Sequence, residues 1–434
     1  MTEKNKSKRK LKLPVTNFML VRDMLIKTKT MKTMKTMKTI AIFLTSTFLF
    51  ASCSIFKTIK LIKQGEIEQK QFKVQIPFEN RAGLIVLKVK INEIEHDFLF
   101  DTGAPTVLSE NLFKKLNLKV KAVQKTTDSQ GNTSQLGFVE VDKISIGKIN
   151  FLKIGAAVTD LNQTPEMSCM KIDGILGANL MRKGIWQIDY DKQIITITNS
   201  KDSLLIPENA NIIKFSPDLA GIPLTEVNYN GTIDKNVTID LGSNGDFSSS
   251  IKVFNKFNNK YVPIYRFGAK ASGAFGSSSA IDTTIYAIIP EIKLGDIALS
   301  NQIVEFQKNA KTIGTEFFKN YRVIINWFDN ELIMVKNKDY NYSTLKSYGI
   351  SPIFKENKIF VGSIYMNSSA SDQGIKLGDQ ILEMDGKDFR NCNNDCWCHE
   401  IIEGDNVKES QPMSVIILRD NQELKFQLKF NKLL

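Results

Sequence analysis

The 434-residue chain contains an internal repeat whose landmarks recur in the same order and at nearly the same spacing. Each unit has an Ala-Gly pair, an Asp 18 or 19 residues after that glycine, and an apolar element ending in glycine 76 or 74 residues after the Asp. These landmarks are Gly83, Asp101 and Gly177 in the first unit, and Gly221, Asp240 and Gly314 in the second. Such a recurrence predicts a tandem duplication, with one lobe at 76–204 and another at 205–338.

Both repeat units are written in short strand patterns. Apolar and polar residues alternate from Phe72 onward, and Gly, Asn and Asp interrupt the pattern as far as about residue 337. Segments with the 3.6-residue period of a helix are few, and residues 110–116 form the clearest one. The chain is therefore predicted to be mainly β.

Each Asp of the repeat follows an apolar strand pattern and precedes a small, Gly-containing turn. Phe98-Leu99-Phe100 leads into Asp101, and Val237-Thr238-Ile239 leads into Asp240. Two carboxyl groups brought together in a low-dielectric site cannot both ionise, so they share one proton and supply a base and an acid at the same pH. The duplication therefore predicts a paired carboxyl site for acid–base chemistry.

The stretch Asp101-Thr102-Gly103-Ala104, together with Ile175-Leu176-Gly177, resembles the aspartic peptidases, especially the retropepsin-like lobes of bacterial exported proteins. The resemblance spans 76–338 and implies two closed β-barrel-like lobes with Asp101 and Asp240 as the catalytic dyad. The ionised Asp would activate a water molecule and the protonated Asp would polarise the scissile carbonyl. No cofactor, metal or covalent intermediate is implied.

The family places Thr or Ser directly after each catalytic Asp, where the hydroxyl ties the two loops together. Thr102 fits this pattern, but Leu241 stands at the second position. The loop residues that the resemblance assigns to support of the dyad are Thr102, Gly103, Ala104, Leu241, Gly242 and Ser243.

Each lobe of such a peptidase also supplies a flap over the cleft. The first candidate is the polar segment around Gln130 and Gly131, and the second is the Gly-rich segment around Ser272 and Gly273. A simple surface hairpin explains either segment equally well.

Residues 345–434 carry the pattern Gly-Asp-x-Ile-Leu-x-x-Asp-Gly, which begins at Gly378. This region resembles a PDZ domain, a β-sandwich with short helices that binds extended peptides by adding a strand to an open sheet edge. The resemblance implies a peptide groove along Ile359, Phe360, Val361 and Gly362. The family's carboxylate-binding loop is expected at 355–358, where no glycine occurs.

The basic residues of the chain gather at its N-terminus. Residues 1–63 hold fifteen Lys or Arg and two acidic residues, a local charge of +13 out of a total of +12. The rest of the chain is therefore at −1, which excludes a basic surface for nucleic acid.

This N-terminal segment has the pattern of an export signal. Three Met-Lys-Thr repeats precede an apolar run that ends in Ala51-Ser52-Cys53, which resembles a bacterial lipoprotein processing site. Residues 1–53 are thus predicted to be a signal peptide with an upstream extension, Cys53 the lipidated residue, and 54–75 a linker from the membrane, with the protein facing the periplasm. An uncleaved anchor helix is the alternative, and the true start is open among Met31, Met34 and Met37.

Four further cysteines follow: Cys169, Cys392, Cys396 and Cys398. In an exported chain this number favours disulfides. The last three, with His399, also offer soft donors for a metal, but their spacing matches no common zinc pattern.

These observations predict a monomeric, lipid-anchored aspartic endopeptidase that acts on peptides or unfolded protein and whose PDZ domain engages a peptide. Leu241 motivates an alternative, a catalytically silent module that holds peptides in the same cleft and groove. A further alternative pairs the first lobe with a second copy of itself, which Asp240 makes unnecessary.

Overall fold

The computed structural model describes residues 54–127, 132–269, 272–273, 276–277, 282–403 and 411–434. The predicted signal segment with Cys53, and the flap residues Gln130 and Gly131, lie outside this part of the chain. Two compact units are separated at residue 56, and all that follows concerns the second unit, Lys57–Leu434. Within the described residues, no helix is both long enough and apolar enough to cross a membrane.

The first lobe is a closed ring of six strands. In ring order they are β4 (Leu84–Ile91), β5 (Ile94–Asp101), β10 (Gly174–Gly177), β6 (Val107–Ser109), β9 (Ile149–Thr159) and β8 (Thr133–Ile146), and β8 pairs with β4 again. The helix expected at 110–116 is α2 (Glu110–Lys115), which the Ser109 hydroxyl caps by accepting from the Leu112 N–H at 3.1 Å.

The second lobe repeats this ring strand for strand. Its order is β15 (Pro223–Tyr229), β16 (Thr232–Ile239), β23 (Thr312–Ile313), β17 (Phe247–Ser250), β22 (Ile297–Gln307) and β21 (Asp282–Leu294), and β21 returns to β15. The mainly β fold and the duplication predicted from the sequence, and the barrel-like lobes implied by the family resemblance, are confirmed.

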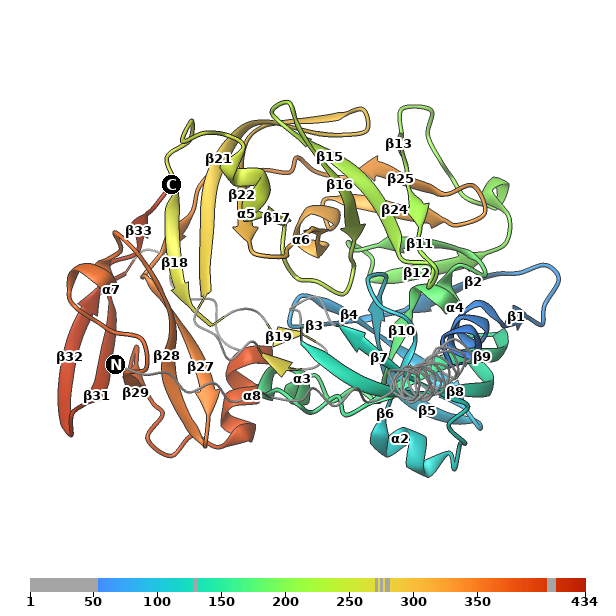
Figure 1. Cartoon of the computed structure of the whole chain (residues 1–434), viewed down its shortest axis with the longest axis horizontal. Helices are drawn as coiled ribbons and strands as arrows, with labels where there is room; N and C mark the ends of the chain where they lie inside the picture. Colours follow the sequence, from blue (N-terminus) through green and yellow to red (C-terminus); the bar gives the residue numbers. More distant parts are fainter. Residues whose placement is uncertain (1–53, 128–131, 270–271, 274–275, 278–281, 404–410) are drawn as a thin grey trace, which may run out of the picture. The chain divides into compact units, whose positions relative to one another are not determined.

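The closing hairpins of the two units join in one six-stranded antiparallel sheet (Figure 1). The order is β2 (Lys73–Pro77), β12 (Ile194–Thr198), β11 (Ile185–Asp189), β24 (Tyr321–Asn326), β25 (Glu331–Lys336) and β13 (Asn211–Lys214). Trp186 of the first unit pairs with Ile325 of the second, and both are fully buried. The two lobes therefore share one core.

Residues 54–75 do not form the linker predicted from the sequence. Leu61 and Ile62 lie in a helix that ends at residue 63, and both are buried against lobe 1. Gly155 allows this contact, because a Cβ there would lie 2.0 Å from the Leu61 carbonyl oxygen. Next, β1 (Glu66–Ile67) pairs with β9. The mixed composition of this segment is compatible with an amphipathic helix, and the apolar residues Leu61 and Ile62 of that helix pack against lobe 1.

The C-terminal region, shown orange to red in Figure 1, adds its strands to the sheet of lobe 2 through the pairing of β28 (Lys358–Tyr365) with β18 (Ile264–Gly268). Its elements are β27 (Ile350–Lys355), β28, α7 (Ser369–Asp372), β29 (Gln380–Met384), β30 (Lys387–Asp388), α8 (Asn394–Glu403), β31 (Met413–Arg419) and β32 (Gln422–Leu428). Asp379 of the Gly-Asp motif is buried, and it accepts from the Arg419 Nε–H and the Lys376 N–H, both at 2.7 Å. This motif therefore fixes a turn.

All four cysteines of the described residues form disulfides, as the sequence favoured. Cys392 pairs with Cys396, and Cys169 of lobe 1 pairs with Cys398 of α8. Within the described residues no group of three or more His, Cys, Asp or Glu side chains is arranged to hold a metal.

Candidate active site

The two Asp residues of the repeat occupy equivalent places in the two rings. Asp101 is the last residue of β5 and Asp240 follows β16 directly. Asp101 lies in register with Gly177 of the parallel strand β10, and the Asp240 N–H donates to the Ile313 carbonyl of β23 at 2.9 Å. Each carboxyl is thus held at the end of a strand that is paired on both sides.

The glycine that ends each apolar landmark lies tightly against its Asp loop. A Cβ on Gly177 would stand 2.1 Å from the Pro105 carbonyl carbon, and one on Gly314 would stand 2.2 Å from the Gly245 carbonyl oxygen. Only glycine fits at either position, which explains why both repeat units have one there.

The glycine after each Asp makes room for the opposite carboxyl group. A Cβ on Gly103 would lie 2.7 Å from Asp240 Cγ, and a Cβ on Gly242 would lie 2.2 Å from Asp101 Cγ. The two loops therefore interlock, and each carboxyl group shifts the pKa of the other. The structure brings the predicted pair together.

Backbone N–H groups surround both carboxyl groups. The Gly103 N–H donates to Asp101 Oδ1 at 2.7 Å, and the Gly242 N–H donates to Asp240 Oδ1 at 3.0 Å. The backbone N–H groups of Ala104 and Ser243 also lower the pKa of Asp101 and Asp240, respectively. These donors favour an ionised carboxylate and fix its plane.

Burial opposes that effect and dominates it. Burial raises the pKa of Asp101 well above its usual value, and the negative charge of Asp240 raises it further. Burial also raises the pKa of Asp240, to about 6. The pair therefore shares one proton near neutral pH.

Thr102 ties the two loops together without a hydroxyl on the other side. Its buried Oγ1 donates to the Ile239 carbonyl at 2.6 Å and accepts from the Leu241 N–H at 2.9 Å. Leu241 is itself fully buried in the shared core. The lobe-2 loop is therefore anchored through its backbone, a contact that the identity of residue 241 does not reveal.

This geometry makes Thr102 the more sensitive of the two positions. We expect Thr102→Val to lower the free energy of unfolding by about 1–3 kcal/mol, because a buried carbonyl and a buried N–H lose their partner. Thr102→Ser, which keeps the hydroxyl, is the matched control. Urea unfolding of the two variants measures the difference, and equal stabilities would show that this bridge is dispensable.

Two residues that the sequence did not single out, Asn179 and Thr315, hold the Asp loops by hydrogen bonds. The Asn179 Oδ1 accepts from the Thr106 N–H at 2.7 Å, and its Nδ2 donates to the Gly155 carbonyl at 2.8 Å. In lobe 2, the Thr315 hydroxyl donates to the Ser243 carbonyl at 2.9 Å. Both residues are buried just after a landmark glycine, in α4 (Ala178–Met181) and α6 (Thr315–Phe318), and that position was the available signal.

The predicted flap residues Gln130 and Gly131 lie outside the described residues, and the strands that precede the two predicted flaps are β7 (Ala122–Thr127) and β18. β7 pairs with β8, and β18 pairs with β21. Ser272 and Gly273 form the short strand β19, which pairs with β20 (Gly276–Ser277). Their role over a cleft stays a prediction.

The predicted PDZ groove residues Ile359, Phe360, Val361 and Gly362 lie in β28, which is an interior strand. It pairs with β27 on one side, and with β29 and β18 on the other. Since its backbone groups are already paired, an added peptide strand has no edge there. Within the described residues β27 pairs only with β28, so its outer edge has no strand partner there.

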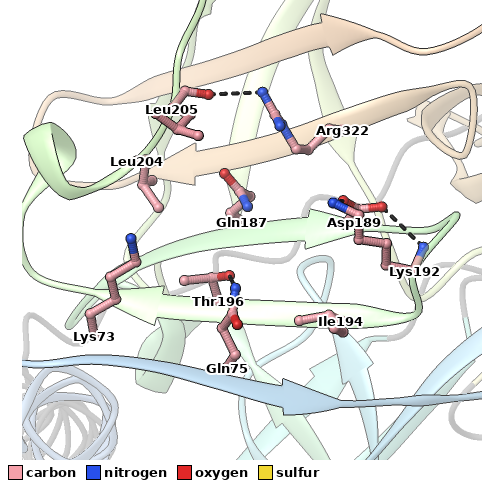
Figure 2. A pocket seen from close by; sticks show the side chains of 10 residues that line it. All are labelled: Lys73, Gln75, Gln187, Asp189, Lys192, Ile194, Thr196, Leu204, Leu205 and Arg322. Carbon is pink, nitrogen blue, oxygen red and sulfur yellow. Dashed lines mark hydrogen bonds and ion pairs between the residues drawn. The ribbon is translucent and has the colours of Figure 1, made fainter.

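A separate cavity of about 170 Å³ lies on the six-stranded sheet (Figure 2). It is lined by Lys73, Gln75, Gln187, Asp189, Lys192, Ile194, Thr196, Leu204, Leu205 and Arg322. Asp189 pairs with Lys192 at 3.5 Å, and Arg322 donates to the Leu205 carbonyl at 2.8 Å. None of these residues belongs to the Asp loops, so this cavity is no part of the candidate site.

The chain matches known protein families in two regions. Residues 87–180 match the family described as Aspartyl protease, and residues 341–397 match the PDZ domain family. Among solved structures, the chain is similar to a retropepsin-like aspartic protease from Rickettsia conorii, with 22% identity over 31% of this chain and 93% of that one, at a TM-score of 0.22. It is also similar to Basic 7S globulin from soybean, with 10% identity over 62% of this chain and 95% of that one, at a TM-score of 0.39. A search of curated proteins found no match. The family matches confirm the resemblance drawn from the sequence: the chain carries an aspartyl protease domain and a C-terminal PDZ domain.

Proposed function

We propose that this protein is an exported, lipid-anchored aspartic endopeptidase that cleaves peptides or unfolded protein with a water molecule activated by Asp101 and Asp240. The observation that carries the proposal is the interlocked pair of buried carboxyl groups, each facing the glycine of the opposite loop. Export and the anchor at Cys53 rest on the sequence pattern, and the two disulfides favour an oxidising compartment.

The two carboxyl groups divide the chemistry between them. Ionised Asp240 takes a proton from the water molecule while the oxygen of that water bonds to the scissile carbonyl carbon. Protonated Asp101 donates a hydrogen bond to the carbonyl oxygen at the same time. The proton gained by Asp240 then passes to the leaving nitrogen as the C–N bond breaks. The dyad ends with one proton, as it began.

Digestion of a random peptide library by the full-length protein, in parallel with Asp101→Asn, tests this proposal. We expect new peptide termini with the wild type alone. Cleavage that persists in the variant would exclude the dyad mechanism. Peptide retention without cleavage by either protein would support the silent binding module that Leu241 suggested.

The pKa directions predict where activity falls on the pH scale. The dyad titrates as a pair, and the active form carries one proton. Since the pKa of Asp240 is about 6 and that of Asp101 is higher, kcat/KM should rise through about pH 6 and fall only when Asp101 loses its proton. Initial rates on a fluorogenic peptide between pH 3 and pH 9 measure this profile. An optimum near pH 3 with no activity at pH 6 would contradict it.

A further inference from the structure

The cavity on the six-stranded sheet has a polar floor, although the other face of the same sheet belongs to the core. Side chains alternate between the two faces along each strand, so Val74, Ile188 and Ile195 pack into the shared core. The residues between them line the cavity (Figure 2): Lys73 and Gln75 of β2, Gln187 and Asp189 of β11, and Ile194 and Thr196 of β12. The floor therefore offers two amide groups and a hydroxyl to a ligand.

A segment that follows β12 covers part of the cavity. Leu204 of this segment is buried in a small apolar cluster on the same face of the sheet, with Ile185, Ile324 and Ile333. Two backbone carbonyl groups of the segment accept hydrogen bonds from cations of the floor. The Ser203 carbonyl accepts from Lys73 Nζ, and the Leu205 carbonyl accepts from Arg322 at 2.8 Å. Since Arg322 lies in β24, both repeat units contribute to the cavity.

The charges that line the cavity are mainly positive. Arg322, Lys73 and Lys192 supply three positive charges, and Asp189 supplies one negative charge. Asp189 pairs with Lys192 at 3.5 Å. Arg322 and Lys73 donate to carbonyl groups instead, and form no ion pair within the described residues. The lining therefore carries two positive charges that no carboxylate of the cavity neutralises.

One buried donor in the cavity has no acceptor. The Nε–H of Arg322 is buried and makes no hydrogen bond within residues 54–127, 132–269, 272–273, 276–277, 282–403 and 411–434. Buried polar groups in folded proteins are nearly always hydrogen-bonded, so an exception needs an explanation. The planar guanidinium group binds oxyanions through parallel N–H donors, of which Nε–H is one. An oxyanion in the cavity supplies the acceptor that this donor lacks.

We propose that the cavity binds a phosphoryl group, whose oxygens accept hydrogen bonds from Arg322 and Lys73. A phosphate monoester carries a charge of about −1.5 to −2 at pH 7, which matches the excess positive charge of the lining better than a single carboxylate does. This site is separate from the Asp loops, so the inference goes beyond the proposed peptidase function.

The size of the cavity limits what it encloses. Its volume of about 170 Å³ is below the range of about 300–1,000 Å³ found for pockets that enclose a drug-sized ligand. The cavity therefore takes the phosphoryl group, and the rest of a larger ester extends past Leu205, whose side chain is 85% exposed. A soluble sugar phosphate and a phospholipid headgroup both carry this group.

Isothermal titration calorimetry of the full-length protein with inorganic phosphate, at constant ionic strength, tests the proposal. We expect saturable binding to one site. Arg322→Gln should raise the Kd at least about 10-fold, because a charge-assisted hydrogen bond is lost. Lys73→Gln should raise it as well, and Lys73 is exposed, so this variant decides the matter even if Arg322→Gln does not fold.

Lys336→Gln is the matched control for charge. Lys336 lies in β25 of the same sheet, pairs with Asp339 and does not line the cavity. Its replacement should leave the Kd within about 2-fold of the wild-type value. Phosphate that binds both cavity variants as tightly as the wild type is an adventitious ion only, and would overturn the proposal. An equal loss of affinity in all three variants, or no saturable binding to the wild type, would overturn it too.

Two further titrants identify the source of the phosphoryl group. Glucose 6-phosphate represents a soluble ester, and vesicles that contain phosphatidic acid represent a lipid headgroup. Wild type and Arg322→Gln share the basic N-terminal segment, so a difference between them in vesicle binding reports the cavity alone. Tighter binding to the vesicles by the wild type assigns the lipid, and binding of glucose 6-phosphate without that difference assigns the soluble ester.

The Asp101→Asn variant separates this proposal from the peptidase assignment. None of the residues that line the cavity belongs to the Asp loops, so the variant should bind phosphate with the wild-type Kd. A protein that cleaves nothing and still binds phosphate through Arg322 would remove the proposed function and leave this site. A protein that cleaves peptides but binds no phosphate would do the reverse.

Discussion

Asp101→Asn should abolish peptide cleavage while making the protein more stable at neutral pH. Asn keeps the acceptor for the Gly103 N–H but cannot take part in proton transfer, so kcat/KM should fall by about 10²–10⁴-fold. Because burial raises the wild-type pKa, the stability that the protonated carboxyl provides is lost as pH rises through that pKa. Asn carries no such charge, so its Tm should exceed that of the wild type by about 2–4 °C at pH 8.

The pH dependence of Tm distinguishes this result from simple damage to the site. The two proteins should have nearly the same Tm at pH 4, where the wild-type dyad is protonated, and should diverge as the pH rises. Differential scanning calorimetry between pH 4 and pH 8 measures the divergence. A Tm for Asp101→Asn below that of the wild type at pH 8 would show that the carboxyl is paired more favourably than its burial implies.

Gly242→Ala should inactivate the protein through packing rather than chemistry. The added Cβ would lie 2.2 Å from Asp101 Cγ, so the loops must separate. Overpacking of this kind costs about 1–3 kcal/mol of unfolding free energy. Displacement of the dyad by about 1 Å should lower kcat/KM by about 10²-fold. Urea unfolding and peptide cleavage measure the two effects.

The same loop offers a glycine with free space as the control for Gly242. A Cβ at Gly245 would meet only the Ser243 hydroxyl, at 3.8 Å, an ordinary contact. Gly245→Ala should therefore leave the free energy of unfolding close to that of the wild type. Its kcat/KM for peptide cleavage should stay within about 2-fold of the wild-type value. If Gly242→Ala behaved in the same way, the interlocked arrangement of the two loops would be wrong.

The sequence predicted the parts of the fold that depend on local pattern and on the repeat. In each unit an apolar strand ends in an Asp, at Asp101 and Asp240. In each unit a glycine, Gly177 or Gly314, lies where the backbone of the Asp loop approaches too closely for a Cβ. Both patterns can be recognised in the sequence because the steric requirement is local and is the same in the two units. The repeat predicts two equivalent lobes, whereas the six-stranded sheet that joins them depends on long-range strand pairing that the sequence pattern does not show. The pairing of the two Asp loops follows from the family resemblance.

Features that depend on long-range contacts escaped prediction. The sequence places Leu61 and Ile62 in a linker. Their burial comes from packing against lobe 1, which is distant in the sequence and cannot be seen in the local pattern. The absence of a hydroxyl at Leu241 suggests a missing contact between the loops. The backbone N–H of Leu241 makes that contact by donating a hydrogen bond to Thr102 Oγ1, and the identity of the side chain does not reveal it. The sequence predicts the PDZ groove along β28. The alternation of side chains in β28 does not show the strand order of the sheet, in which β28 is an interior strand.

The bond between Cys169 and Cys398 has a consequence for the order in which the chain is made. The two residues are 229 positions apart, so Cys169 is synthesised long before its partner. A chain that stops short of Cys398 leaves a thiol on lobe 1 that this bond would have consumed. Thiol labelling of Cys169 would therefore report whether a given molecule was synthesised as far as Cys398.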